Sequence, residues 1–492
     1  MAENTKITKD NGNENSYRSI LKGTSLLGGV QVIQILVNLV RGKFVAMFLG
    51  PDGMGISSLF ASSSNTINQI SSLGLNLAVI KEVAASSANT TDSRHVLAVA
   101  LRLTQLTAMG GALFCALFSP WLSRVTFGSN TYAWQFLLLS VMIYLTTAGG
   151  GKLAILQGMH ELKRISKATL TGSFTGLVVG VPLYYFFGTL GIVPAMVILS
   201  FVTWAFYSWN LRKVIPRDRI RFNRNIHKPL VKRLLSLGVV LMSTGLLSAL
   251  SIYLLNIFLR KYGEIDTVGL YQAANSITNQ YSGVVFTAMS MDYMPRLSKV
   301  CNDRLLTNDI VNRQAQIVAF IVTPLAILLI LSAPIVIRIL LTVSFLSVTP
   351  LMRWMGFGII LKAISFPMGY IAFAKGDKKL FFWLEGVFAN LLYLVLACLF
   401  FHFFGFIGLG YSMVVENFLY LMIIYLVTRN RYGYRQSRGA SCSYIIAILL
   451  GAGCFLCSYI HEPTIRYVFM SLIFALSATV SILYMRHLLK QS

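Results

Sequence analysis

The stretch QVIQILVNLVRGKFVAMFLG, residues 31–50, decides the fold, because it is an apolar run of the length that crosses a membrane as a helix. It nevertheless carries polar side chains at steps of three, four and three residues, which places them on one helical face: Gln31, Gln34, Asn38 and Arg41. A polar face inside hydrocarbon must meet protein or water rather than lipid. The stretch therefore predicts a membrane helix that borders a polar interior.

The whole chain has the composition of a polytopic membrane protein. Of its 492 residues, 55% are hydrophobic and only 12% are charged, whereas soluble domains are about a quarter charged. Apolar length and its interruptions predict 14 membrane helices. Their ranges are 20–49, 54–80, 96–118, 134–158, 168–187, 189–211, 234–260, 268–293, 314–341, 349–374, 381–404, 406–428, 442–460 and 467–485.

Charge asymmetry orients these helices. With both termini in the cytoplasm, 31 of the 42 Lys and Arg residues fall in cytoplasmic segments, five fall outside and six lie within spans. Basic loops that face anionic lipid explain the net charge of +25, so no nucleic acid partner is expected.

The six cysteines and six histidines form no metal-ligand spacing, and we expect neither a metal nor a cofactor.

The longest loop divides the chain. The predicted segments are a cytoplasmic tail at 1–19, helices 1–6 at 20–211, a basic cytoplasmic loop at 212–233, helices 7–12 at 234–428, and helices 13–14 with a cytoplasmic C-terminus at 429–492. The fold class that follows is an all-α membrane protein with two six-helix lobes and two further helices. An even number of helices per half makes both halves enter the membrane in the same direction.

Two more predicted helices carry polar stripes. Residues 268–293 contain Gln272, Asn275 and Asn279 on one face, and residues 54–80 contain Asn65, Asn68 or Gln69, and Asn76. Hydrogen bonding between helices, worth about 1 kcal/mol per contact, would explain a single such residue. Three coherent stripes favour a water-filled central cleft instead.

Cations inside spans are costly and need a reason. Arg41 extends the first stripe, which favours cavity lining over snorkelling, whereas both readings stay open for Lys43 and Lys152. Lys362 lies near the middle of 349–374, where a functional role is favoured. For Arg102 and Arg353, close to span ends, snorkelling is favoured.

Three acids accompany these cations. Glu416 lies midway along 406–428 and either pairs with a buried cation or binds the proton or sodium ion that drives transport. Asp292, a second candidate for ion coupling, and Glu385 lie nearer the cytoplasmic face, where ordinary solvation is the favoured account. Because buried cations outnumber buried acids, the cleft is suited to an anion, such as a phosphate that Arg binds in a bidentate manner.

The order and spacing of several motifs carry a family resemblance. They are KGTSLLGGVQVIQILVNLVRGKFVAMFLGPDGMGI (22–56), SSLGLNLAVIKEVA (71–84), DTVGLYQAANSITNQYSGVVFTAMSMDYMPRLSKV (266–300) and GYIAFAKGDKKLFFWLEG (369–386). With them the chain resembles the Wzx-type O-antigen flippases, in the polysaccharide transporter branch of the MOP (multidrug/oligosaccharidyl-lipid/polysaccharide) exporters. The resemblance covers nearly the whole chain.

The resemblance implies a function as well as a fold. Two six-helix lobes would surround a central cavity that opens alternately to either side of the bacterial inner membrane. The implied substrate is an oligosaccharide repeat unit linked to undecaprenyl diphosphate, moved from the cytoplasmic to the periplasmic leaflet with a proton or sodium gradient. The family's recurring buried cations correspond to Lys43 and Lys362, with Arg41 as a companion. Other membrane proteins of polysaccharide assembly are candidate partners.

Two other functions were compared with this one. A lipid II or drug exporter would share the architecture, although exporters of organic cations favour buried carboxylates. A membrane polymerase or ligase would need large external loops with paired catalytic groups, and the predicted external loops here are short. We therefore expect a transporter with no catalytic residues.

The predicted orientation can be tested with topology reporters. Alkaline phosphatase, which is active only outside the cytoplasm, should be inactive when fused after Ser492 and active when fused after Glu462. A fluorescent protein that folds only in the cytoplasm should give the reciprocal result. An active phosphatase at the C-terminus would contradict the orientation.

Overall fold

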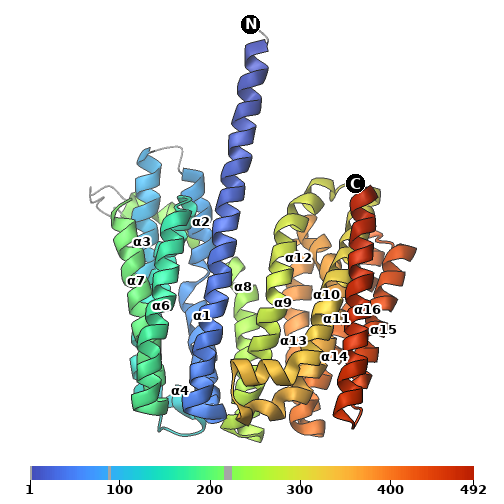
Figure 1. The fold of residues 1–492 in the computed structure, drawn as a ribbon. Helices are drawn as coiled ribbons and strands as arrows, with labels where there is room; N and C mark the ends of the chain where they lie inside the picture. The colour runs from blue at the N-terminus through green and yellow to red at the C-terminus, as the bar shows by residue number, and fades with distance from the viewer. Residues whose placement is uncertain (1–2, 87–89, 215–223, 492) are drawn as a thin grey trace. The chain divides into compact units, whose positions relative to one another are not determined.

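The computed structural model describes residues 3–86, 90–214 and 224–491, which form helices and no strand (Figure 1). The α-helices are α1 (Glu3–Ser72), α2 (Leu75–Ser86), α3 (Thr90–Leu117), α4 (Ser119–Phe127), α5 (Ala133–Gly158), α6 (Leu162–Phe187), α7 (Ile192–Arg212), α8 (Arg224–Tyr262), α9 (Ile265–Val300), α10 (Arg304–Leu340), α11 (Thr349–Ala374), α12 (Lys378–Phe381), α13 (Ala389–Phe404), α14 (Gly408–Tyr432), α15 (Arg438–Cys457) and α16 (Pro463–Gln491). Short helices complete the chain, namely η1 (Gly188–Gly191), η2 (Val343–Val348), the π-helix η3 (Phe382–Phe388) and η4 (Gly405–Ile407).

Ten segments of the described residues are long and apolar enough to span a membrane. Three of them contain two helices in tandem, and the turn in each begins at a glycine with positive φ: Gly50 (65°), Gly188 (56°) and Gly405 (61°). Glycine adopts this backbone conformation without the strain that a Cβ would cause. Together with α9, whose polar stripe lowers its hydropathy, these segments fit the predicted count of about 14 helices and the all-α fold class.

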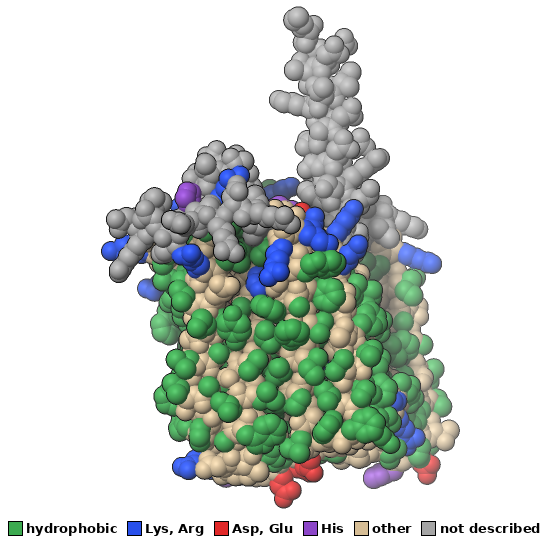
Figure 2. All heavy atoms as spheres, turned by 90° about the vertical axis from the view of Figure 1, so that its left-hand side faces the viewer, with side chains coloured by type: hydrophobic (Ala, Val, Ile, Leu, Met, Phe, Trp, Pro, Cys, Tyr) green, Lys and Arg blue, Asp and Glu red, His purple; other side chains and the backbone are tan. Residues whose placement is uncertain are grey.

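The surface agrees with this assignment. One face of the molecule shows a broad hydrophobic belt, and the visible Lys and Arg side chains gather mainly at one end of it (Figure 2). Large apolar side chains are exposed on α3 and α6, for example Leu117 (68%), Val178 (69%) and Phe186 (74%). An apolar belt of this kind matches a hydrocarbon surround rather than water.

The chain forms two compact units. Unit 1 consists of residues 1–49 and 60–246, and unit 2 consists of residues 50–59 and 247–492. The turn between the two halves of α1 therefore packs with the C-terminal unit, and the first part of α8 packs with the N-terminal unit. Among the predicted segments, the loop at 212–233 falls partly outside the described residues, at 215–223.

Several predicted boundaries were wrong, since helices continue beyond the apolar run. Residues 3–19, predicted as a tail, and residues 224–233, predicted as loop, are helical. The predicted helix 54–80 is interrupted at Leu73 and Gly74, which have φ of 45° and 64°. The length of an apolar run reflects the thickness of the membrane. The helix itself can continue beyond that run, because its backbone hydrogen bonds also form in water.

Unit 1 depends on close helix contacts at α5. A Cβ on Gly151 would lie 2.6 Å from Thr104 of α3, and one on Gly150 would lie 3.0 Å from the Asn76 amide of α2. Small residues at such positions let helix backbones approach, which is a main source of packing energy in membranes. The triple glycine of α5 thus brings polar side chains of two neighbours against it.

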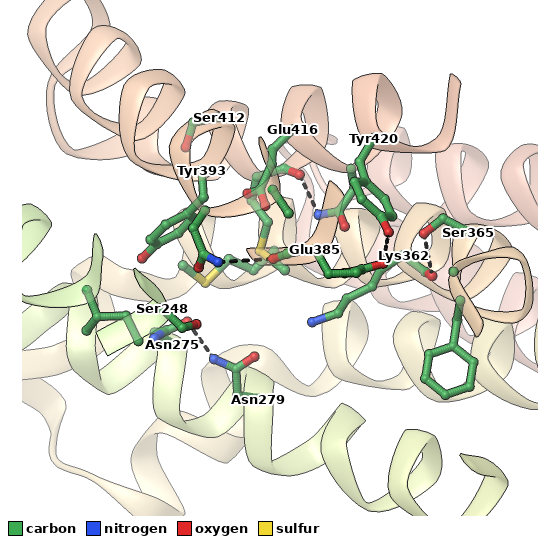
Figure 3. A pocket seen from close by; sticks show the side chains of 18 of the residues that line it. Ser248, Asn275, Asn279, Lys362, Ser365, Glu385, Tyr393, Ser412, Glu416 and Tyr420 are labelled. Atoms are coloured by element: carbon green, nitrogen blue, oxygen red, sulfur yellow. Dashed lines mark hydrogen bonds between the residues drawn. The ribbon is translucent and has the colours of Figure 1, made fainter. Parts of the chain in front are cut away.

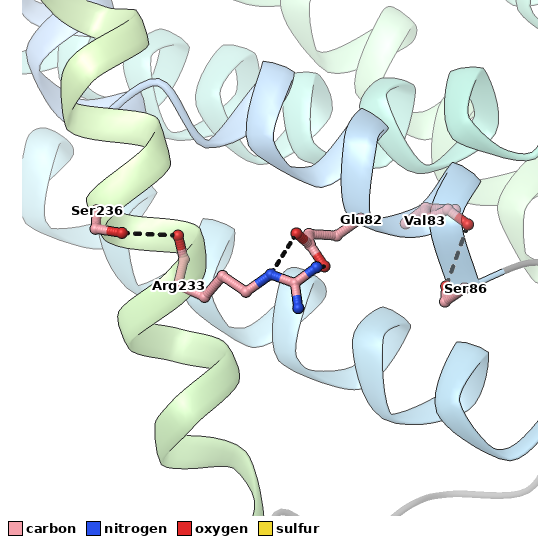
Figure 4. Close-up of polar contacts among 5 residues, drawn as sticks. All are labelled: Glu82, Val83, Ser86, Arg233 and Ser236. Atoms are coloured by element: carbon pink, nitrogen blue, oxygen red, sulfur yellow. Dashed lines mark hydrogen bonds and ion pairs between the residues drawn. The ribbon is translucent and has the colours of Figure 1, made fainter.

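The start of α8 is held to α2 by a contact of two glycines and an ion pair (Figure 4). A Cβ on Gly238 would lie 2.4 Å from the Leu73 carbonyl oxygen. The Arg233 guanidinium donates from Nε to Glu82 Oε1 at 2.8 Å and lies 2.7 Å from Oε2 through Nη2. The Glu82 side chain is only 6% exposed, so this bidentate pair satisfies a buried carboxylate.

Unit 2 contains an equally close contact. A Cβ on Gly269 of α9 would lie 1.9 Å from the Pro51 carbonyl oxygen, and one on Gly55 would lie 2.0 Å from the Ile265 carbonyl oxygen. Residues 50–59 therefore lie against the first turns of α9, the helix that carries Asn275 and Asn279.

A matched pair of substitutions on α9 tests this contact. Gly269→Ala should destabilise the protein by about 1–3 kcal/mol, because the new methyl group has no room beside a backbone carbonyl. Gly283→Ala is the control, since a Cβ there meets nothing within 4 Å and alanine favours the helix. Thermal unfolding in detergent, followed by fluorescence-detected size exclusion, compares them. Equal unfolding midpoints for the two variants would contradict the close contact at Gly269.

Candidate functional site

Unit 2 contains a cavity of about 700 Å³, lined by both polar and apolar side chains, a size typical of small-molecule sites (Figure 3). Its walls come from α8, α9, α11, α12, η3, α13 and α14. Figure 3 shows Asn275 and Asn279 of α9 along one wall, and Glu416 and Tyr420 of α14 along another. All the lining residues belong to unit 2.

Three charged side chains line this cavity: Lys362 of α11, Glu385 of η3 and Glu416 of α14. The Lys362 side chain is exposed and points into the space (Figure 3). Its ammonium lies near enough to both carboxylates to interact with them electrostatically. No ion pair forms between Lys362 and either acid in the described part of the chain, so the ammonium remains available to a ligand.

Glu385 owes its position to the π-helical turn. A π-helix is rare, and such turns are frequent at functional sites because they redirect side chains. Asn390 donates from Nδ2 to the carbonyl oxygens of Gly386 (2.8 Å) and Glu385 (3.1 Å), which supports the widened turn. The Tyr420 hydroxyl then donates to Glu385 Oε1. A Cβ on Gly369 would lie 3.1 Å from that oxygen, so glycine leaves room for the pair.

A contact at the end of α14 holds the helices around η3 in place. Asp377 caps α12 by accepting from the Leu380 N–H at 3.1 Å, and it also accepts from Tyr432 at 3.0 Å and Arg431 at 2.8 Å. These donors, the Leu380 N–H first, lower the pKa of Asp377. Because Arg431 and Tyr432 end α14, this carboxylate joins α12 to the helix that carries Glu416.

The remaining polar groups pair along the walls. The Tyr271 and Tyr393 hydroxyls lie 2.8 Å apart, which links α9 to α13. Asn279 donates from Nδ2 to Asn275 Oδ1 at 2.8 Å. This bond spans one turn of α9 and holds both amides toward the cavity (Figure 3).

The structure gathers four of the predicted residues in this cavity: Lys362, Glu416, Asn275 and Asn279. Gln272, the next member of the α9 stripe, is half-buried and lies outside the lining. Asp292 is also outside the cavity, and its carboxylate is exposed and pairs with Arg296 one turn along α9.

The other predicted residues belong to unit 1. Lys152 is 8% exposed, its Nζ donates to Ser208 Oγ at 2.6 Å, and it lies 4.0 Å from the Trp204 ring centroid. Asn68 Oδ1 accepts from the Thr146 and Thr147 hydroxyls at 2.8 and 3.0 Å. Both side chains therefore make contacts between helices. For Asn68 this is the alternative that the sequence left open, whereas the two readings for Lys152 were a functional role and snorkelling.

The predicted polar residues in the two halves of α1 and in α2 are partly exposed. Gln31, Asn38 and Asn65 are exposed, whereas Gln34, Arg41, Lys43 and Asn76 are half-buried. Arg41 lies near enough to Tyr184 of α6 to interact with it electrostatically. A cavity role for these residues stays a prediction.

Sequence reasoning missed Glu385 and Tyr420. Glu385 was expected to be solvated at the interface, but the structure places it inside the cavity. Apolar periodicity assumes 3.6 residues per turn and cannot foresee a π-turn. In this cavity two carboxylates face one ammonium. The expectation that cations outnumber acids along the whole predicted cleft stays a prediction.

The chain was compared with known proteins. A family model described as polysaccharide biosynthesis protein matches residues 44–350. The lipid III flippase of Escherichia coli K12 is 22% identical over 369 residues, which cover 74% of this chain and 87% of that protein.

Solved structures share the fold. The lipid II flippase MurJ in an inward closed conformation has a TM-score of 0.72 at 13% identity, covering 95% of this chain and all of that one. An inward-facing MATE-family multidrug transporter of the MOP superfamily has a TM-score of 0.70 at 18% identity, covering 81% of this chain and 94% of that one.

Cysteine accessibility tests the position of Lys362. In a variant without the six native cysteines, Lys362→Cys should react with a small water-soluble thiosulfonate, because its side chain projects into the polar cavity. Lys152→Cys, buried between α5 and α7, is the control and should react at least about tenfold more slowly. Equal labelling rates in membranes would contradict the described cavity.

Proposed function

Because this chain belongs to the polysaccharide biosynthesis protein family and has the fold of MOP-superfamily transporters, we propose that it flips a lipid-linked oligosaccharide across the inner membrane. The substrate is a repeat unit on undecaprenyl diphosphate, as in O-antigen assembly. The observation that carries the proposal is the cavity of unit 2, where an unpaired ammonium meets amides and hydroxyls inside a bundle of membrane helices.

The substrate has three parts with different needs. The diphosphate needs cations, and we assign this role to Lys362. Arg41 and Lys43, which belong to unit 1, stay predicted cation sites. The glycan needs a wet polar lining, which Asn275 and Asn279 supply. The prenyl chain stays in lipid. Moving the polar parts through the protein avoids the cost of burying charge and hydroxyl groups in hydrocarbon.

Transport follows from alternating access, in which a substrate site opens to one side of the membrane and then to the other. An energy source can bias the cycle by binding one state more tightly than the other. Glu416 is the group we assign to the coupling proton or sodium ion, because its carboxylate faces the cavity without a protein partner among the described residues. We assign no coupling role to Asp292, whose exposed carboxylate pairs with Arg296.

A second candidate function is export of an organic cation. Two carboxylates in the cavity favour it, as does the likeness to a multidrug transporter fold. The family match and the central ammonium favour the lipid-linked oligosaccharide. Drug susceptibility of an expressing strain separates the two.

Complementation tests the proposed function. In a flippase-deletion strain, Lys362→Ala should lower surface polysaccharide at least about tenfold, since the diphosphate loses a charge-assisted contact. Lys362→Arg should retain more export, and Arg338→Ala, an exposed cation of α10, should behave as wild type. Normal export by Lys362→Ala at equal membrane abundance would contradict the assignment.

A further inference from the structure

The balance of hydrogen-bonding groups in the cavity of unit 2 points to the chemistry of the glycan. Many protein donors there are already used by the protein, although the Lys362 ammonium, the Asn275 amide and the Ser248 and Tyr370 hydroxyls donate no hydrogen bond within the described residues. Ser365 donates to the Lys362 carbonyl (3.0 Å), Ser412 to the Leu409 carbonyl (2.9 Å), and Asn417 Nδ2 to the Met413 carbonyl (2.7 Å). Asn390 and Tyr420 donate as described above. Polar walls made this way present oxygen atoms to whatever fills the cavity.

Acceptors, by contrast, remain available. Glu416 makes no hydrogen bond or ion pair within the described ranges, and Tyr420 occupies only one oxygen of Glu385. The Asn279 amide donates to Asn275, which leaves its own Oδ1 toward the cavity. An acceptor in this setting is satisfied by water or by an O–H or N–H group of a ligand.

The net charge of the lining also favours ligand groups that donate hydrogen bonds. Its charged groups are Lys362, Glu385 and Glu416, and its other titratable groups are the tyrosines 271, 370, 393 and 420. Before the coupling ion binds to Glu416, with both acids ionised, the lining carries one net negative charge. If a phosphate oxygen takes the Lys362 ammonium, the two carboxylates face the rest of the headgroup without compensation.

Resting on the proposed function, we propose that this cavity is the glycan subsite and that Glu385 and Glu416 set its specificity. They select sugars rich in hydroxyl, amide N–H or amino groups, such as N-acetylamino sugars. They exclude uronic acids, because a sugar carboxylate would meet like charge and would present acceptors to acceptors. Aromatic side chains at Phe366 and Tyr370 provide apolar wall for the sugar rings.

Glu416 is the sharper of the two determinants. Substituting it breaks no hydrogen bond of the protein, so Glu416→Gln tests recognition without disturbing the fold. Glu385 is different, because it accepts from Tyr420 and borders Gly369. Glu385→Gln keeps the size of the side chain and an acceptor oxygen for Tyr420 while it removes the charge.

Saturation-transfer NMR on the full-length protein in lipid nanodiscs tests the specificity directly. The probes are triacetylchitotriose, which is neutral and rich in donors, and trigalacturonate, which has the same number of rings and a carboxylate on each. Wild type should bind triacetylchitotriose and not trigalacturonate. The single variant Glu416→Gln and the double variant that also carries Glu385→Gln should bind triacetylchitotriose about tenfold more weakly than wild type. Both variants should also bind trigalacturonate. Glu462→Gln, an exposed acid, is the control.

Three results would overturn the proposal: equal binding of both probes by wild type, no binding of either, or an unchanged preference in Glu416→Gln. The complementation experiment is independent of these results. If the preference is absent while Lys362→Ala still abolishes export, the glycan subsite fails and the flippase function stands. If the preference is present while Lys362→Ala exports normally, the diphosphate assignment fails and the subsite stands.

Discussion

A polar group inside a membrane must find a partner within the protein or in water, and this constraint governs the structure at every level. It forces the backbone into helices, whose hydrogen bonds are internal. It also governs side chains, since Thr104, Ser71 and Thr323 each donate to the carbonyl oxygen four residues back at 2.7–2.8 Å. Because these hydroxyl groups are hydrogen-bonded to the backbone, their residues can lie in apolar surroundings at little cost in free energy.

The cavity of unit 2 meets this constraint in a different way. There the Lys362 ammonium and the Glu416 carboxylate form no hydrogen bond or ion pair with the described residues, although each would be expensive in contact with lipid. Groups left in this state are satisfied by what enters the cavity. The arrangement is therefore better explained by a polar cargo than by stability.

Both compact units rely on glycine for the contacts that position polar side chains. Gly150 and Gly151 bring Asn76 and Thr104 against α5, and Gly369 makes room for Glu385 and Tyr420. The Glu82–Arg233 pair then holds the start of α8 to α2. Membrane helices gain little hydrophobic energy from association, so close approach and buried polar pairs carry more of the stability than in a soluble protein.

The sequence by itself determined the fold class and the family, and it singled out Lys362 and Glu416 as charged side chains within apolar spans. These follow from apolar length, ordered motifs and the cost of charge near the middle of a span, all of which are local in the chain. The tertiary structure decided the rest. Helix ends extend past the apolar runs because water tolerates helical backbone, and Lys152 binds Ser208 because α5 and α7 pack together. Glu385 enters the cavity because a π-turn breaks the periodicity on which its prediction depended.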